Sequence, residues 1–184
     1  WNPLDAVHRT SHLRVGEIQA IGHVLYPTEH VKDAFWNESA RNLFLGLCLY
    51  LLETPTLPCS LGELLRQASG KGQPIKDYVN GLMNKRGLGH APLSNECTEA
   101  LQRFCTTSDN TMAGILATFT APLTIFSNPI VDAATSATDI DLSAVRKRRM
   151  AIYVGIPANR LSDAALLVNL FFSQLIHYNT IDLP

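Results

Sequence analysis

Apolar residues recur with the period of an α-helix through most of the chain. The clearest stripe, in residues 108–126, consists of Met112, Ile115, Leu116, Phe119, Leu123 and Phe126. Shorter stripes of the same period run through residues 12–25, 75–85 and 95–105. Because side chains three and four positions apart share one face of a helix, these stripes predict amphipathic helices around a common core. The pattern as a whole predicts a mainly α protein, a bundle of about seven to eight helices.

Two features refine this bundle. Residues 35–53 are apolar on almost every side, which is typical of a helix at the centre of a bundle. Pro122 interrupts the stripe of residues 108–126, and it lacks the backbone N–H that the turn before it needs. We therefore expect a kink near Thr118.

Polar residues mark where further helices begin. Ser60 followed by Glu63 has the spacing of a capping box, in which each side chain accepts from the other residue's backbone N–H. The pair Asn128 and Pro129 should open one more helical turn, and Asp141 should cap a short helix.

Residues 150–156 have a different character. This segment is rich in β-branched and aromatic residues, is apolar on both faces and is closed by Pro157. Such a pattern predicts a strand buried in a parallel sheet, and the apolar helix expected over 161–178 would complete half of a βαβ unit. One strand makes no sheet, so we expect its partners to lie outside this chain.

Charge is segregated along a chain that is nearly neutral overall. The 184 residues have a formal net charge of −1, so bulk charge does not favour nucleic acid or an anionic membrane. Residues 61–90 nevertheless carry five basic side chains against two acidic ones, whereas residues 91–142 carry one basic against six acidic. Residues 143–184 are basic again, with five cations against two carboxylates.

The two basic regions supply the candidate binding residues. They are Lys71, Lys76, Lys85 and Arg86 in the first region, and Arg146, Lys147, Arg148 and Arg149 in the second. Both sets are suited to contact DNA phosphates, and the second set ranks behind the first because it adjoins the strand expected over residues 150–156. The alternative for both is an ordinary solvated helix surface, because the first region has a single aromatic residue, Tyr78, and a run of four cations also suits a helix end.

No constellation of catalytic residues is visible in the sequence. The segment Gly70-Lys71-Gly72 is too short for a phosphate-binding loop and follows a predicted helix rather than a strand. His8 and His12 are four positions apart and would share a face if they lay on a helix, but no third metal ligand stands at a matching spacing. The cysteines have neither disulfide nor zinc spacing and are interpreted as buried thiols, namely Cys48, Cys59, Cys97 and Cys105. The longest apolar run, residues 43–52, is half the length of a membrane span.

Ordered landmarks in the chain resemble those of one protein family. They include Trp1-Asn2-Pro3-Leu4-Asp5 at the start and Phe35-Trp36 with the apolar run behind it. The most specific set is Phe126-Ser127-Asn128-Pro129, Ala133-Ala134-Thr135-Ser136, Asp139-Ile140-Asp141-Leu142, Arg146 to Arg149 and Met150-Ala151-Ile152-Tyr153-Val154. In this order and spacing, the chain resembles the TraG/TraD-type coupling proteins of conjugation and type IV secretion.

The resemblance implies a place for this chain in a larger protein. Such proteins are hexameric ATPases anchored at the cytoplasmic face of a bacterial inner membrane, with an all-α domain inserted in a RecA-like nucleotide-binding domain. It implies that residues 1–10 are a flank of the nucleotide-binding domain, 11–149 the all-α insertion, and 150–184 the returning strand and helix. We expect the Walker A loop before Trp1 and the Walker B acid after Pro184.

The resemblance also implies partners and cofactors. The all-α domain is expected to recruit relaxosome proteins, relaxase-bound single-stranded DNA or secreted proteins to the type IV secretion machinery. ATP and magnesium belong to the parent protein, so we expect no cofactor and no ATP turnover in this chain, which should be monomeric by itself. The alternative is a structural helical scaffold between subunits, without direct contact to substrate.

Overall fold

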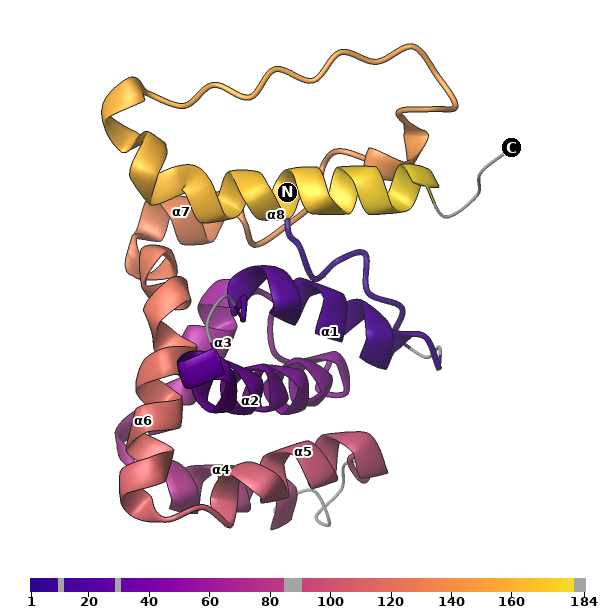
Figure 1. The fold of residues 1–184 in the computed structure, drawn as a ribbon. Helices are drawn as coiled ribbons and strands as arrows, with labels where there is room; N and C mark the ends of the chain where they lie inside the picture. Colours follow the sequence, from indigo (N-terminus) through magenta and orange to yellow (C-terminus); the bar gives the residue numbers. More distant parts are fainter. Residues whose placement is uncertain (10–11, 29–30, 85–90, 181–184) are drawn as a thin grey trace.

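The computed structural model describes residues 1–9, 12–28, 31–84 and 91–180, and it is mainly α (Figure 1). The described residues contain eight α-helices, which confirms the predicted fold class. The α-helices are α1 (Arg14–Leu25), α2 (Ala34–Leu52), α3 (Leu61–Ala68), α4 (Ile75–Asn84), α5 (Asn95–Cys105), α6 (Asp109–Thr120), α7 (Pro129–Ala134) and α8 (Leu161–Thr180). Short 3₁₀ helices link them, namely η1 (Val31–Asp33), η2 (Gly70–Gly72), η4 (Ala121–Ser127), η5 (Leu142–Ala144) and η6 (Ala158–Arg160).

Helix α2 forms the centre of the bundle, as its uninterrupted apolar sequence predicts. It packs against α1, α5 and α6, which lie on different sides of it (Figure 1). Phe44, Cys48 and Leu51 are completely buried. The Tyr26 ring stacks on Phe119 with centroids 6.0 Å apart, and its hydroxyl donates to the Phe119 carbonyl at 2.9 Å. The buried phenol is therefore hydrogen-bonded, as the burial of a polar group requires.

Helix α6 and η4 together form one rod that runs past α2 and ends at α7 (Figure 1). The kink predicted near Thr118 is not formed; the α-helix ends at Thr120, and a 3₁₀ helix follows directly. Because Pro122 cannot donate to the preceding turn, the chain tightens into 3₁₀ geometry and continues in nearly the same direction. The rod thereby connects the α4–α5 end of the bundle to the α7–α8 end.

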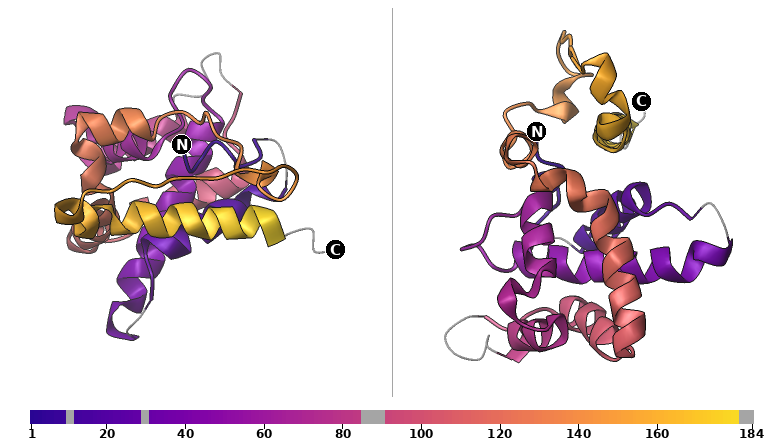
Figure 2. Two further views of the ribbon diagram at one scale, coloured as in Figure 1. Left: turned by 90° about the horizontal axis from the view of Figure 1, so that it is seen from above. Right: turned by 90° about the vertical axis from the view of Figure 1, so that its left-hand side faces the viewer.

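The strand expected over residues 150–156 is not formed. Residues 151–157 have neither helical nor strand hydrogen bonding, and Tyr153 is 93% exposed rather than buried. A strand exists only in a ladder with another strand, and the described residues provide no such partner. The segment instead runs as an extended connection alongside α8 (Figures 1 and 2).

Helix α8 lies across one end of the helical body (Figure 2). It contacts α1 and η5, and of its described side chains Leu170 and Gln174 are buried. Its other apolar side chains include Phe172 and Ile176, which are exposed. The seam between α8 and the body is therefore narrow, whereas the packing around α2 is extensive.

Candidate functional site

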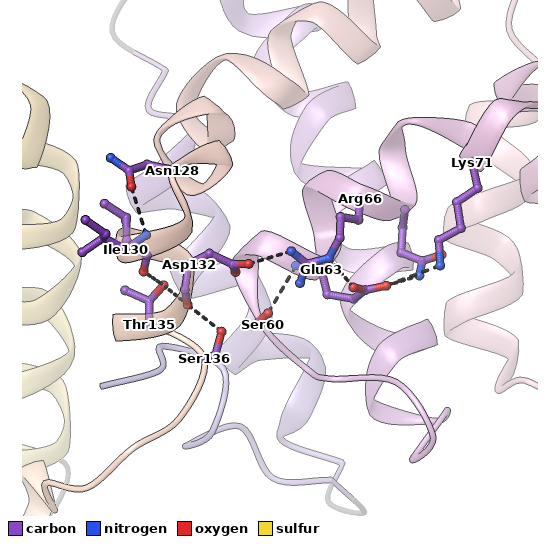
Figure 3. A network of polar contacts seen from close by, with 11 residues as sticks. Ser60, Glu63, Arg66, Lys71, Asn128, Ile130, Asp132, Thr135 and Ser136 are labelled. Carbon is purple, nitrogen blue, oxygen red and sulfur yellow. Dashed lines mark hydrogen bonds and ion pairs between the residues drawn. The ribbon is translucent and has the colours of Figure 1, made fainter.

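Charged side chains join α3 to η2 and α7 (Figure 3). Glu63, which is 5% exposed, accepts from Arg66 Nε at 2.6 Å, and its other oxygen lies 3.5 Å from Lys71 Nζ. Arg66 also donates from Nη1 to Asp132 Oδ2 at 2.7 Å, so one guanidinium bridges two helices. A carboxylate this deeply buried needs such partners, because an unpaired charge away from water is costly.

Of the two hydrogen bonds in the predicted capping box, the one accepted by Ser60 is formed. Ser60 accepts from the Glu63 N–H at 3.2 Å, as expected. The Glu63 carboxylate, however, accepts from Arg66 and from Gln67 Nε2, the latter at 2.6 Å. The hydrogen bond to Glu63 is also the main reason why the pKa of Arg66 is raised. Glu63 therefore holds Arg66 in place within α3, and Arg66 in turn reaches Asp132 of α7.

Lys71 reaches Glu63 from a backbone conformation that is unusual for lysine. Its φ of +48° lies in the left-handed region, between Gly70 and Gly72 with φ of +68° and +86°. Glycine adopts this conformation without strain, whereas lysine does so at a cost. The turn brings the Lys71 ammonium to Glu63, so this candidate DNA-contacting charge already has a partner within the fold.

Lys76 also faces a carboxylate. Its Nζ lies 4.0 Å from Asp109 at the start of α6, and both side chains are well exposed. Lys85 and Arg86 lie outside the described residues. Lys71 and Lys76 thus each face a different carboxylate, and DNA contact by this set stays a prediction.

All four cations of the second basic set are exposed, and one of them is hydrogen-bonded to α8. Arg146 donates from Nη1 to the Asn179 carbonyl at 2.6 Å, close to the C-terminal end of α8, where a cation is favourable. Lys147, Arg148 and Arg149 are exposed, and none forms an ion pair within the described part of the chain. Hydrogen bonds from Ser143, followed by the charges of Arg148 and Lys147, lower the pKa of Asp141. Asp141 caps η5 as predicted, through the Ser143 N–H at 2.9 Å.

Sequence reasoning missed the structural role of Asn2. This side chain is 2% exposed, and its Nδ2 donates to the Cys59 carbonyl at 2.8 Å and to Asp5 at 2.9 Å. Its backbone N–H donates to Thr138 Oγ1 at 2.9 Å. Gln174 of α8 donates to the Pro3 carbonyl at 2.8 Å. The opening segment therefore ties together the loop before α3, the loop after α7, and α8.

The cavity beside this segment has a volume of about 590 Å³. Its walls include Trp1, residues 138–143 and Tyr178, and its carboxylates are Asp5, Asp139 and Asp141. Such a volume is in the range of small-molecule sites. No group of side chains within the described ranges has the composition of a metal centre.

The cysteines are buried and free, as the sequence predicts. Burial raises the pKa of the Cys48 thiol well above its usual range and that of Cys59 to about 11. A thiol that stays protonated at neutral pH is a poor nucleophile and a poor metal ligand. These residues therefore belong to the core rather than to a reactive site.

A family model described as Type IV secretory system Conjugative DNA transfer matches residues 1–184. The chain therefore belongs to this family of conjugative DNA transfer proteins, in agreement with the resemblance noted in the sequence. No curated protein matches the chain, and no solved structure matches it either. Among the described helices, none has the length and apolar character needed to cross a membrane.

Proposed function

We propose that this chain is the all-α substrate-recognition domain of a coupling ATPase in conjugative transfer. Its parent protein would be a hexamer attached to the bacterial inner membrane, which binds ATP and magnesium in a RecA-like domain. The domain would bring relaxosome proteins with relaxase-bound single-stranded DNA, or secreted proteins, to the transfer machinery. The observation that carries the proposal is a family match over the whole of a chain whose fold is mainly α.

The proposed division of the chain also rests on packing. The body around α2 contains most of the buried side chains, whereas α8 has few. Residues 151–157 are extended and unpaired, and Tyr153 is exposed. A segment of this kind is suited to join the edge of a sheet in the parent protein. This supports 11–149 as the all-α insertion, with residues 1–10 and 150–184 as flanks of the nucleotide-binding domain.

Among the candidate DNA contacts, we rank three cations of the second basic set first, which reverses the order expected from the sequence. Lys71 and Lys76 each face a carboxylate, which reduces the attraction that a phosphate would feel. Lys147, Arg148 and Arg149 are exposed and form no ion pair among the described residues, although the charges of Arg148 and Lys147 act on Asp141. We therefore place these three first for contact with the DNA backbone, with Lys71, Lys76, Lys85 and Arg86 second.

A structural scaffold between subunits is the alternative function. The pairing of Lys71 with buried Glu63 favours the scaffold. In that pairing the lysine stabilises the contact between α3 and η2 and is less available to bind a ligand. In this case the charged surface would hold the fold together, and the domain would bind neither DNA nor substrate proteins.

Salt-dependent DNA binding separates these possibilities. The experiment titrates a labelled single-stranded oligonucleotide into the 184-residue chain at several salt concentrations. One variant changes Lys147, Arg148 and Arg149 to Ala, and the matched variant changes the same number of cations, Lys76, Lys85 and Arg86, to Ala. Each lost phosphate contact should reduce the slope of log K against log salt by about 0.7 for a single strand.

The outcomes of this titration are distinct. A slope reduced by about two units in the 147–149 variant supports our order of the two sets. A larger loss in the other variant reverses that order. Absence of binding to DNA, and to relaxosome proteins added at micromolar concentration, would favour the scaffold.

A further inference from the structure

Five side chains form a continuous hydrogen-bonded relay from α4 to α7. In order they are Tyr78 of α4, then Gln67, Glu63 and Arg66 of α3, and Asp132 of α7. The Tyr78 hydroxyl donates to Gln67 Oε1, and Gln67 Nε2 donates to Glu63 Oε1 at 2.6 Å. Arg66 then links Glu63 to Asp132, with donor–acceptor distances of 2.6 and 2.7 Å (Figure 3). The relay therefore crosses α3 and ends on a different helix at each side.

The middle of the relay is shut off from water. Gln67 is completely buried, and Glu63 is nearly so. The Gln67 amide has one orientation, because its oxygen faces a donor and its nitrogen faces an acceptor. The Tyr78 phenol remains a donor at neutral pH, since burial, followed by electrostatic interaction with Tyr50 and Glu63, raises its pKa to about 12. Hydrogen bonds in such a buried chain strengthen one another, so the loss of one weakens the next.

Asp132, at the far end of the relay, depends on Arg66. Its Oδ1 is buried against Gly62, leaving no room for a Cβ there, and accepts no hydrogen bond from the described residues. Its Oδ2 is held by Arg66, the one cation that pairs with Asp132 in the described part of the chain. A carboxylate with one orphaned oxygen is sensitive to the loss of its remaining partner. A shift of the Arg66 guanidinium therefore acts on α7 through Asp132.

The two ends of the relay reach surfaces with different roles. Helix α4 carries Lys76, and Lys85 and Arg86 follow this helix directly in the sequence. Behind α7, the Ser136 carbonyl accepts from Asn2 Nδ2 at 3.5 Å, which connects α7 to the opening segment. In the proposed function, the first surface carries candidate DNA contacts and the second borders the nucleotide-binding domain.

We propose that this relay couples α4 to α7, so that a ligand bound on α4 changes how α7 holds the opening segment. Displacement of Tyr78 releases Gln67, and the loss passes through Glu63 and Arg66 to Asp132. The coupling is reciprocal, as thermodynamic linkage requires, so a change at α7 also acts on α4. The ligand part of this inference rests on the proposed function, whereas the coupling itself is a property of the chain alone.

A double-mutant cycle in the 184-residue chain measures the coupling. Tyr78→Phe removes the first donor and Asp132→Asn removes the charge of the last acceptor, and both changes keep the shape of the side chain. The change in the equilibrium constant of urea unfolding in the double variant should differ by at least about threefold from the product of the two single changes. Additive effects would overturn the proposal, because residues without an energetic connection act independently.

Three further variants distinguish the relay from general damage to α4. Val79→Ala opens a cavity on the buried face of α4 but removes no member of the relay, and Tyr178→Phe removes a hydroxyl of α8 that donates to none of the described residues. Both should be additive with Asp132→Asn. Gln67→Met replaces the central amide with an apolar side chain of similar length, so the coupling between positions 78 and 132 should disappear in that background. Equal coupling by Val79→Ala, or coupling that persists in the Gln67→Met background, contradicts the relay.

Nuclear magnetic resonance follows the same path in the folded protein. The Arg66 Nε–H signal is the reporter, because this group lies three hydrogen bonds from the Tyr78 hydroxyl. Tyr78→Phe should shift this signal and accelerate hydrogen exchange of the Thr135 amide, which bonds within α7, whereas Tyr178→Phe should leave both unchanged. An Arg66 signal that does not move in Tyr78→Phe refutes the coupling.

Neither measurement uses DNA or ATP. A failed coupling therefore leaves the proposed function standing, and a failure to bind DNA or relaxosome proteins leaves the measured coupling standing.

Discussion

Replacing Gly62 with alanine should separate α3 from α7. A Cβ at this position would lie 1.9 Å from Asp132 Oδ1 and 2.6 Å from Asp132 Cγ, far inside contact distance. The other carboxylate oxygen is held by Arg66 at 2.7 Å, so Asp132 cannot turn away without stretching that bond. The methyl group would therefore push Asp132 away and weaken the Arg66–Asp132 ion pair that joins α3 to α7.

The magnitude follows from three opposing effects. Alanine in place of glycine within a helix ordinarily stabilises by about 0.5–1 kcal/mol. Overpacking costs about 1–3 kcal/mol. Weakening the partly exposed Arg66–Asp132 pair costs about 0.2–1 kcal/mol. These ranges combine to a net loss of about 0.2–3.5 kcal/mol with a centre near about 2 kcal/mol, and a loss of that central size lowers Tm by roughly 4–8 °C in a chain of this length.

Calorimetry or urea unfolding measures this loss against a matched control. Gly16→Ala lies in α1 with nothing within 4 Å of the new Cβ, and should stabilise the protein by about 0.5–1 kcal/mol. In an Asp132→Ala background the clash disappears, so Gly62→Ala should become neutral or stabilising. If Gly62→Ala stabilises the unmodified protein as Gly16→Ala does, the close approach of α7 to α3 is refuted.

Three further predictions concern the same fold. Ser60→Ala removes the acceptor for the Glu63 N–H and should cost about 1 kcal/mol in urea unfolding; an unchanged midpoint would contradict the cap. Asn2→Ala leaves the Cys59 carbonyl without its buried donor and should cost about 1–3 kcal/mol by thermal unfolding, and an unaltered Tm would show that the opening segment is not a structural tie. Because burial raises the pKa of Cys59 from 9.0 to about 11, the unfolded thiol ionises first, so the free energy of unfolding should fall between about pH 9 and 11. This fall should be smaller in Cys59→Ala, and equal slopes would count against the buried thiol.

Helix positions follow from local rules, so the sequence alone predicts them well. The expected helix over 95–105 has the bounds of α5, and Ser60 caps α3 as its spacing requires. These features depend on side chains three or four positions apart, whose relative placement a helix determines. The central position of α2 is predicted for the same reason, because a helix that is apolar all round has no face for water.

The partners of the charged residues are decided by tertiary structure. In the sequence, Arg66 and Lys71 form part of a basic region, and nothing local indicates that they meet Asp132 and Glu63. Arg66 and Asp132 are separated by 66 positions and come together only when α7 packs on α3. The number of cations in a segment of the sequence therefore overestimates the number that remain unpaired on the folded surface and can bind a ligand.

The same distinction explains residues 150–156 and Asn2. The apolar pattern of 150–156 identifies a segment suited to a sheet, but a strand needs hydrogen bonds from another strand, and these are absent from the described residues. Asn2 has no local signal, since its partners at Cys59 and Thr138 lie far along the chain. The sequence by itself determined the helices and their buried faces through short-range periodicity. Only the folded chain decided which polar groups pair, because pairing requires atoms within about 3 Å in space and not along the sequence.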